Sequence, residues 1–320
     1  MWPDLDDRGH LVGYVNDRQP NNWGRWGPDD ELGTVNFITP AMVTEAAGSV
    51  RDGRAVSCAI PIQEVMPVNP ARPAVVHTFM YTGVDFAGPD AHKEFNGFQG
   101  SDDHISMPLQ SSTHWDGLAH VAHDDAMYNG FWAGNVAAYS GARRCGTHLL
   151  KDRLAGRGVL LDIARHLGVD HLAPGHAITV DELDACAAAQ DVEIGTGDIL
   201  LLRTGEMPFF YGLPDKAEFW LAGSPGLAME TVDWIHHREI AALAVDNIAI
   251  EVVPARPYEG GYPMHARLIR DLGLTIGELW WLEELTEACE AANRWEFFLV
   301  AAPLHVTNAA GAPINPIAFL

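Results

Sequence analysis

The chain of 320 residues is long enough to bury a sizeable core, either as one large domain or as two smaller ones. Its 43 acidic and 20 basic residues give a formal net charge of −23. A surface this acidic argues against nucleic acids and anionic membranes as partners, because both require a basic surface. The hydrophobic and charged fractions, 48% and 20%, are those of a globular protein rather than a disordered one.

The cysteines and the lack of long apolar segments bear on the cellular compartment of the protein. The chain has four cysteines, far apart and without a CxxC pair, which favours reduced thiols over a disulfide framework. The first ten residues lack the basic and apolar regions of a signal peptide. No apolar run approaches the roughly 20 residues of a transmembrane helix. We therefore expect a cytoplasmic protein.

The predicted elements alternate along most of the chain. Residues 1–40 are rich in Trp, Pro, Gly, Asn and Asp, which predicts turns laid over a core. Thr179 followed by Glu182 forms a capping box that opens a helix reaching about residue 190. Apolar runs and helical spacing predict strands at 158–163, 198–204, 241–251 and 295–306, and helices at 227–239 and 264–273, the last ended by Gly273.

Alternating strands and helices predict an α/β fold, with a mixed, partly parallel sheet and helices covering its faces. No internal repeat or low-complexity linker divides the chain. We therefore expect a single domain over residues 1–320, with an irregular N-terminal portion at about 1–40.

A cluster of polar side chains stands out at residues 107–125, MPLQSSTHWDGLAHVAHDD. In an extended strand, His114 and Asp116 would share one face. If the strand continued, His120 would lie roughly 20 Å from His114, because each residue advances about 3.3 Å. The chain must therefore turn after Asp116, most easily at Gly117. A helix starting there would place Asp116 and His120 on one face.

Two interpretations of this cluster remain open on spacing alone. Imidazole and carboxylate together suit Zn²⁺, Mn²⁺ or Fe²⁺ better than Ca²⁺ or Mg²⁺. Alternatively, His114 and His120 are ordinary core or surface histidines, and Asp116 is their hydrogen-bond partner. His123, followed by two aspartates, fits a solvated loop. Motifs of serine hydrolases, dinucleotide-binding folds, P-loops and HExxH metalloenzymes are absent from the sequence.

The segment QSSTHWDGLAH resembles the signature of the cyclase-family metal hydrolases, which include bacterial kynurenine formamidase, isatin hydrolase and a trans-dienelactone hydrolase. Their pattern is His-x-Gly-Thr-His-x-Asp-x-Pro-x-His. Four positions match it, and three depart from it. Further similar blocks lie at 25–40, 197–206, 243–251, 264–285 and 297–320, so the resemblance spans nearly the whole chain. The matching residues are Thr113, His114, Asp116 and His120, and the departures are Gln110, Ser112 and Leu118.

The resemblance implies a swivelling β/β/α domain, usually assembled as a homodimer or homotetramer. It implies that His114, Asp116 and Glu278 hold a divalent metal, while His120 and His265 are either further ligands or catalytic acid–base groups. Gln110 stands where the family has its first histidine and is a possible ligand. Because a carboxamide is a poorer donor than imidazole, we expect one Mn²⁺ or Zn²⁺ per chain rather than two.

This metal chemistry predicts a hydrolase of the arylformamidase type. Hydroxide formed at the metal would open an amide, lactam or lactone bond of a small aromatic or cyclic substrate. His120 would carry the proton, with His265 sharing that role or stabilising the intermediate. The alternatives are a non-hydrolytic cyclase or dehydratase on the same scaffold, and a non-catalytic metal- or ligand-binding protein.

Candidate substrate contacts come from the flanking aromatic residues and one arginine. Flat aromatic side chains would suit an aromatic substrate, although core packing is the competing interpretation. Arg203 would either receive a substrate carboxylate or form a structural salt bridge. Asp246 would either orient a ligand or cap a loop. The residues expected to contact the substrate are Trp115, Arg203, Phe209 and Trp280.

Overall fold

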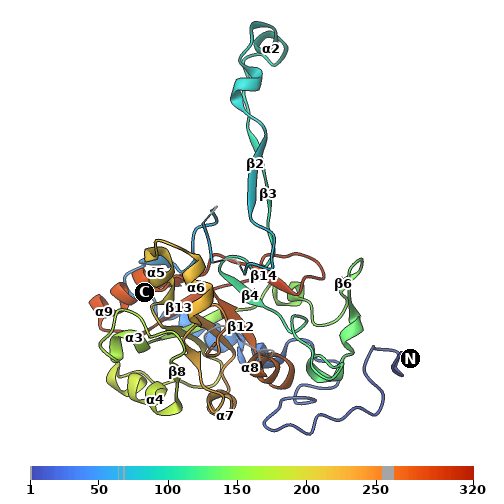
Figure 1. Ribbon diagram of the computed structural model, residues 1–320, viewed down its shortest axis with the longest axis vertical. Coiled ribbons are helices and arrows are strands. Elements are labelled where there is room, and N and C mark those ends of the chain that lie inside the picture. Colours follow the sequence, from blue (N-terminus) through green and yellow to red (C-terminus); the bar gives the residue numbers. More distant parts are fainter. Residues whose placement is uncertain (1, 64, 68, 254–262) are drawn as a thin grey trace.

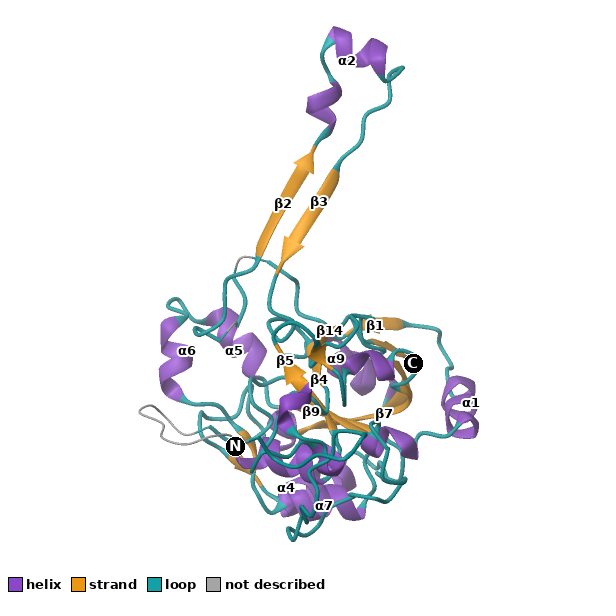
Figure 2. Ribbon diagram, turned by 90° about the vertical axis from the view of Figure 1, so that its right-hand side faces the viewer, coloured by secondary structure: helices purple, strands orange, loops and turns teal. Residues whose placement is uncertain are grey.

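A nine-stranded mixed sheet organises the body of the molecule (Figures 1 and 2). The computed structural model describes residues 2–63, 65–67, 69–253 and 263–320. Four central strands run parallel, and every other pair of neighbours is antiparallel. The strands, in spatial order, are β1 (Ala55–Ser57), β15 (Ile317–Phe319), β13 (Glu296–Val300), β7 (Ala155–Asp162), β9 (Ile199–Arg203), β11 (Ala242–Val245), β12 (Thr275–Glu278), β4 (His114–Asp116) and β14 (Gly311–Pro313).

Helices cover both faces of this sheet. Alternate residues of β7, β9 and β11 point into two separate cores, as strands buried on both faces require. One core contains side chains of α4 (Val180–Ala189), α7 (Thr231–His237) and the π-helical turn η6 (Ala266–Asp271). The other contains side chains of α9 (Glu283–Ala292) and η1 (Gly33–Phe37). The mixed α/β architecture with covering helices is confirmed.

Shorter elements complete the description. They are α1 (Pro40–Gly48), η3 (Tyr128–Gly130), η4 (Ala133–Asn135), β5 (Val136–Ala137), β6 (Gly141–Ala142), η5 (Thr147–Leu150), α3 (Ile163–His166), β8 (Ala177–Ile178), α5 (Glu206–Gly212), α6 (Ala217–Ala222), β10 (Gly226–Leu227) and α8 (Pro263–His265). None of the helices in the described ranges is long and apolar enough to cross a membrane. The four cysteines are buried free thiols.

Most predicted elements are present, with shorter bounds. The capping box forms as expected, since the hydroxyl of Thr179 accepts from the amide of Glu182 and the carboxylate of Glu182 accepts from the amide of Thr179. The predicted strands correspond to β7, β9, β11 and β13, but β11 stops at Val245 and β13 at Val300. The predicted helix at 227–239 forms only over Thr231–His237, because Leu227 pairs with Ile178 as part of β10 and the helix starts after the turn that follows.

A hairpin that the sequence analysis did not predict projects from the body (Figures 1 and 2). Its strands β2 (Val76–Tyr81) and β3 (Asp102–Ser106) pair antiparallel as a two-stranded sheet separate from the main one. Two short helices, η2 (Gly83–Phe86) and α2 (Pro89–Glu94), form its tip. We call residues 76–106 the arm.

Candidate metal centre

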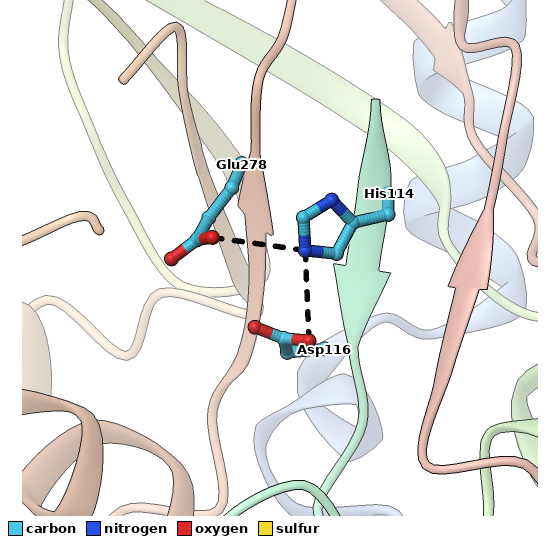
Figure 3. Close-up of side chains that lie close together, drawn as sticks. All are labelled: His114, Asp116 and Glu278. Atoms are coloured by element: carbon cyan, nitrogen blue, oxygen red, sulfur yellow. Dashed lines mark ion pairs between the residues drawn. The ribbon is translucent and has the colours of Figure 1, made fainter. Parts of the chain in front are cut away.

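The centre of the site is built on the pairing of β4 with β12. His114 and Asp116 lie on one face of β4, because side chains alternate along a strand. Glu278 lies directly opposite His114 in the register of the two strands. The Nε2 atom of His114 is 3.6 Å from Oδ1 of Asp116 and 3.7 Å from Oε2 of Glu278 (Figure 3). The sequence-predicted ligands are thus brought together, with their ligand atoms within 4.8 Å of one another.

Two of these ligand atoms are buried without a hydrogen bond. The Nδ1 atom of His114 lies 2.7 Å from the carbonyl oxygen of Ser112, which can only accept, so Nδ1 carries the proton. The lone pair of Nε2 therefore points at the two carboxylates. Among the described residues, neither Nε2 of His114 nor Oδ1 of Asp116 has a hydrogen-bond partner. Buried polar atoms are rarely left without a hydrogen-bond partner. A divalent cation between these two atoms would satisfy both.

The donor set fits such an ion. One neutral imidazole and two carboxylates bring two negative charges to a site in which all three side chains are buried. Buried charges of one sign are costly unless a counter-charge accompanies them. Mixed nitrogen and oxygen donors are typical of Zn²⁺ and Mn²⁺ sites.

His265 joins the site from the far side of Glu278. Its Nε2 lies 3.1 Å from Oε1 of Glu278, and its Nδ1 lies 2.7 Å from Oε2 of Glu251. Glu251 also accepts from the backbone amides of His265 and Met264. Burial opposes a charge on this imidazole, but its hydrogen bonds with Glu251 and Glu278 outweigh burial and raise the pKa of His265 to about 10. His265 is therefore held between two carboxylates.

His120 reaches the site through a turn rather than through the helix we predicted. After β4, the amide of Gly117 donates to Ala310, and the amide of His120 donates back to the carbonyl of Gly117. This turn leaves the Nε2 atom of His120 3.6 Å from Oδ2 of Asp116. The side chain of His120 is 25% exposed, whereas those of His114, Asp116 and Glu278 are 0%, 1% and 7% exposed. Of these four side chains, His120 has the best access to solvent.

Gln110 lies beside His120. Its carboxamide nitrogen is 3.4 Å from Nδ1 of His120. The side chain is wedged against β14, where a Cβ added to Gly311 would come within 2.4 Å of the carboxamide nitrogen. The structure thus places Gln110 at the edge of the cluster, in contact with the candidate proton carrier.

Comparison with known proteins identifies the family. A family model described as a putative cyclase matches residues 35–252, more than half of the chain. The chain belongs to the cyclase family. The search of curated proteins gave no match.

Solved structures agree with this assignment. A novel cyclase is 41% identical, with a TM-score of 0.89, and the match covers 94% of this chain and 99% of that one. An isatin hydrolase bound to the product analogue thioisatinate is 20% identical, with a TM-score of 0.61 and coverage of 88% and 99%. Isatin hydrolase A from Labrenzia aggregata is 18% identical, with a TM-score of 0.59 and coverage of 85% and 94%. The last two likenesses are evidence of the shared fold alone.

Two aromatic residues expected to contact substrate lie in the core of this cyclase-family fold instead. Trp115 lies on the face of β4 opposite His114, and its indole nitrogen donates to the carbonyl of Ala301. Trp280 packs against it edge to face, at 5.0 Å between ring centroids. Both side chains are fully buried. The prediction that they bind substrate is therefore wrong.

Arg203 and Phe209 are also committed to contacts within the chain. Arg203 is buried and donates to Asp162 at 2.9 Å and to both carboxylate oxygens of Glu283 at 2.8 Å. Arg203 thus forms a structural salt bridge, the second of its two predicted roles, and has no guanidinium edge left for a substrate carboxylate. Phe209 packs on the ring of His171, with centroids 4.5 Å apart, and remains half-buried.

Asp246 caps a loop rather than orienting a ligand. Its carboxylate accepts from the amide and hydroxyl of Thr204 and from the amide of Gly205, each at 2.7 Å. Complete burial raises the pKa of Asp246 to about 6, in spite of these hydrogen bonds and the nearby Arg203. His123 pairs with Asp124 at 2.9 Å, and its side chain is 39% exposed, in keeping with a loop at the surface.

Two residues important to the site were missed by the sequence analysis. Glu251 ends the block at 243–251 that resembles the family, but nothing in its local pattern links it to His265. The hydroxyl of Thr113 donates to the carbonyl of Leu279 at 2.5 Å and accepts from the amide of Ile60 at 2.9 Å. Thr113 thereby links its own segment to those of Ile60 and Leu279, the residue after Glu278. This link gives a physical reason for threonine in the motif.

Proposed function

We propose that this cyclase-family chain is a metal-dependent hydrolase that opens an amide, lactam or lactone bond in a small cyclic or aromatic substrate. The observation that carries the proposal is the pair of buried, unsatisfied ligand atoms, Nε2 of His114 and Oδ1 of Asp116, facing Glu278. The fold shared with isatin hydrolases, and with a neighbour described as a predicted metal-dependent hydrolase, supports the same chemistry.

His114, Asp116 and Glu278 would hold one Mn²⁺ or Zn²⁺ per chain. When bound, such an ion would lower the pKa of a water molecule towards about 7 and would polarise a carbonyl oxygen. The carboxylates of Asp116 and Glu278 balance its charge. The proton on Nδ1 of His114, shared with the carbonyl of Ser112, keeps Nε2 directed at the site.

His120 is the residue we assign to proton transfer. It stands 3.6 Å from Asp116, and its side chain is a quarter exposed, so it can exchange protons with solvent between turnovers. Imidazole can both accept and donate a proton in catalysis. His120 would take the proton of the attacking water and return it to the leaving nitrogen or oxygen.

His265 would act indirectly, through its contact with the carboxylate of Glu278. Because it lies between Glu251 and Glu278, it can hold the carboxylate of Glu278 in one orientation. A proton on Nε2 of His265 also offsets part of the negative charge gathered in the site. We propose that Glu251 sets the position of His265, as carboxylates do behind histidines near metals.

The test is a hydrolysis screen on protein stripped of metal and then loaded with one equivalent of Mn²⁺ or Zn²⁺. The panel is an aryl formamide such as N-formylkynurenine, isatin as the lactam, and an unsaturated lactone. We expect metal-dependent hydrolysis of at least one class, abolished in Asp116→Asn and retained in the surface control Asp181→Asn.

Two other outcomes would replace the proposal. A bound metal with conversion that consumes no water would assign a cyclase or dehydratase. A stoichiometric metal with no conversion of any class would assign a binding protein.

A further inference from the structure

An arginine lies beside the candidate metal centre. Arg72 belongs to the segment that enters the arm, and its Nη1 atom donates to the backbone carbonyl of Gln110, in the segment that leaves the arm. The carboxamide nitrogen of Gln110 lies in turn 3.4 Å from Nδ1 of His120. Gln110 therefore links Arg72 to the proposed proton carrier, with its backbone towards one and its side chain towards the other.

The turn that carries Arg72 is anchored to the body. The amide of Arg72 donates to the carbonyl of Asn69 at 2.8 Å, and the side chain of Asn69 accepts from the amide of Ala71 at 2.9 Å. Met66 and Pro67, just before this turn, are buried. The segments that enter and leave the arm lie side by side at its foot (Figures 1 and 2). The guanidinium is therefore held beside the site before any ligand binds.

No carboxylate in the described ranges pairs with Arg72. Acidic side chains are not scarce, since the chain has 43 of them against 20 basic ones. Arg203, which was expected to receive a substrate carboxylate, is instead used by Asp162 and Glu283. Arg72 is half-buried, and a charge that is partly removed from water favours a counter-charge. A ligand can supply that counter-charge.

We propose that Arg72 receives a carboxylate of the substrate while the bond to be hydrolysed lies at the metal centre. This inference rests on the proposed function, and it narrows the substrates to small amides, lactams or lactones that carry a carboxylate. Guanidinium and carboxylate form two parallel, charge-assisted hydrogen bonds. The contact with Gln110 is made through Nη1, so the edge formed by Nε and Nη2 is the one that faces such a pair.

The charge of the whole chain makes this contact decisive. A formal net charge of −23 repels anions from the protein at long range. A substrate that carries a carboxylate therefore gains nothing from the overall field. If the protein binds an acid more tightly than its neutral analogue, a cation in direct contact with the acid must provide the difference.

The experiment measures the binding of matched acids and amides by isothermal titration calorimetry. The acids are ortho-, meta- and para-aminobenzoate, the amines that hydrolysis of the corresponding aryl formamides would release, and the neutral analogues are the three aminobenzamides. The protein is the full chain supplied with one equivalent of Mn²⁺. We expect wild type to bind at least one acid about 10–100-fold more tightly than its amide, the effect of a hydrogen bond between charged groups.

Substitutions of Arg72 test whether it provides this preference. Arg72→Gln should weaken the binding of the acid to the level of the amide and leave the binding of the amide unchanged. Arg72→Lys should keep part of the preference, because an ammonium keeps the charge but loses the planar fork. The matched control is Arg294→Gln, which should bind both ligands like wild type. Arg294 is also half-buried and donates to a carbonyl, that of Ser49 at 2.8 Å, but β7, β9, β11 and β12 separate its neighbour β13 from β4.

The outcomes separate this proposal from the proposed function. Equal Kd values for acid and amide in wild type would overturn the role of Arg72, and so would an Arg72→Gln variant that keeps the preference. Equal weakening of both ligands in Arg72→Gln would reduce Arg72 to a support for Gln110. A wild type that prefers acids through Arg72 but hydrolyses no formamide would sink the proposed function alone. If Arg72→Gln fails to fold, an unchanged preference in Arg72→Lys would overturn the proposal.

Discussion

The substitution Glu251→Gln tests whether the carboxylate of Glu251 sets the pKa of His265. Glu251 accepts from Nδ1 of His265 at 2.7 Å and from the amide of His265 at 2.8 Å. Glutamine keeps the shape and one acceptor oxygen but removes the charge. A hydrogen bond to a charged group contributes about 1.5–3 kcal/mol. Since one pH unit corresponds to about 1.4 kcal/mol, the pKa of His265 should fall by about one to two units from its value near 10.

The same change alters how stability depends on pH. The pKa of His265 is raised in the folded protein, from 6.5 to about 10. Its stabilising contribution is therefore complete below pH 6.5 and is lost as the pH rises through 10. In metal-free Glu251→Gln this loss should occur at lower pH. At pH 7 the free energy of unfolding of the variant should be about 1.5–3 kcal/mol lower than that of wild type. This difference should shrink towards pH 10.

Two measurements on metal-free protein check this prediction. Nitrogen-15 NMR of labelled imidazoles gives the titration midpoint of His265, assigned with a His265→Gln sample. Urea unfolding at pH 7 and pH 10 gives the free energies. The control is Glu287→Gln, which replaces an exposed acid on α9. It should change neither the titration midpoint of His265 nor the free energy of unfolding. A titration midpoint that is the same in wild type and Glu251→Gln would refute the reasoning.

Three further substitutions test other parts of the account. His120→Ala should keep its bound metal but lose about 10²–10⁴-fold in turnover, and loss of the metal in elemental analysis would make His120 a ligand. Arg203→Met should cost about 3–5 kcal/mol in urea unfolding, because it leaves the carboxylate of Glu283 and a buried aspartate without their partner; a cost near zero would mean that the salt bridge is dispensable. Gly277→Ala should cost about 1–3 kcal/mol, because the added Cβ would lie 2.5 Å from the indole nitrogen of Trp280; an unchanged urea midpoint would show that this packing can relax.

The parts of the fold that could be predicted are those with a strong local signal. β7 and β9 are nearly continuous apolar runs, because both of their faces are buried. Thr179 and Glu182 specify a helix start through hydrogen bonds three residues apart. The arm has no such signal, since neither face of its strands packs on a core and no alternation of apolar and polar residues results.

In the site, prediction succeeded where spacing along the chain fixes geometry. His114 and Asp116 must share one face of the strand. The same alternation places Trp115 on the opposite face, away from the metal ligands, so its place in the core could have been predicted. The sequence alone cannot show that the register of β4 and β12 puts Glu278 opposite His114, and only the family resemblance supplied that residue. The contact of Glu251 with His265 depends on tertiary folding, which leaves no local pattern.

The metal content of the purified chain tests the central claim most directly. Elemental mass spectrometry would compare wild type with His114→Ala and with His305→Ala, which removes an exposed histidine elsewhere. The account predicts about one Mn or Zn per chain in wild type and His305→Ala, and almost none in His114→Ala. A wild type that neither contains metal nor takes up added Mn²⁺ or Zn²⁺ would contradict it.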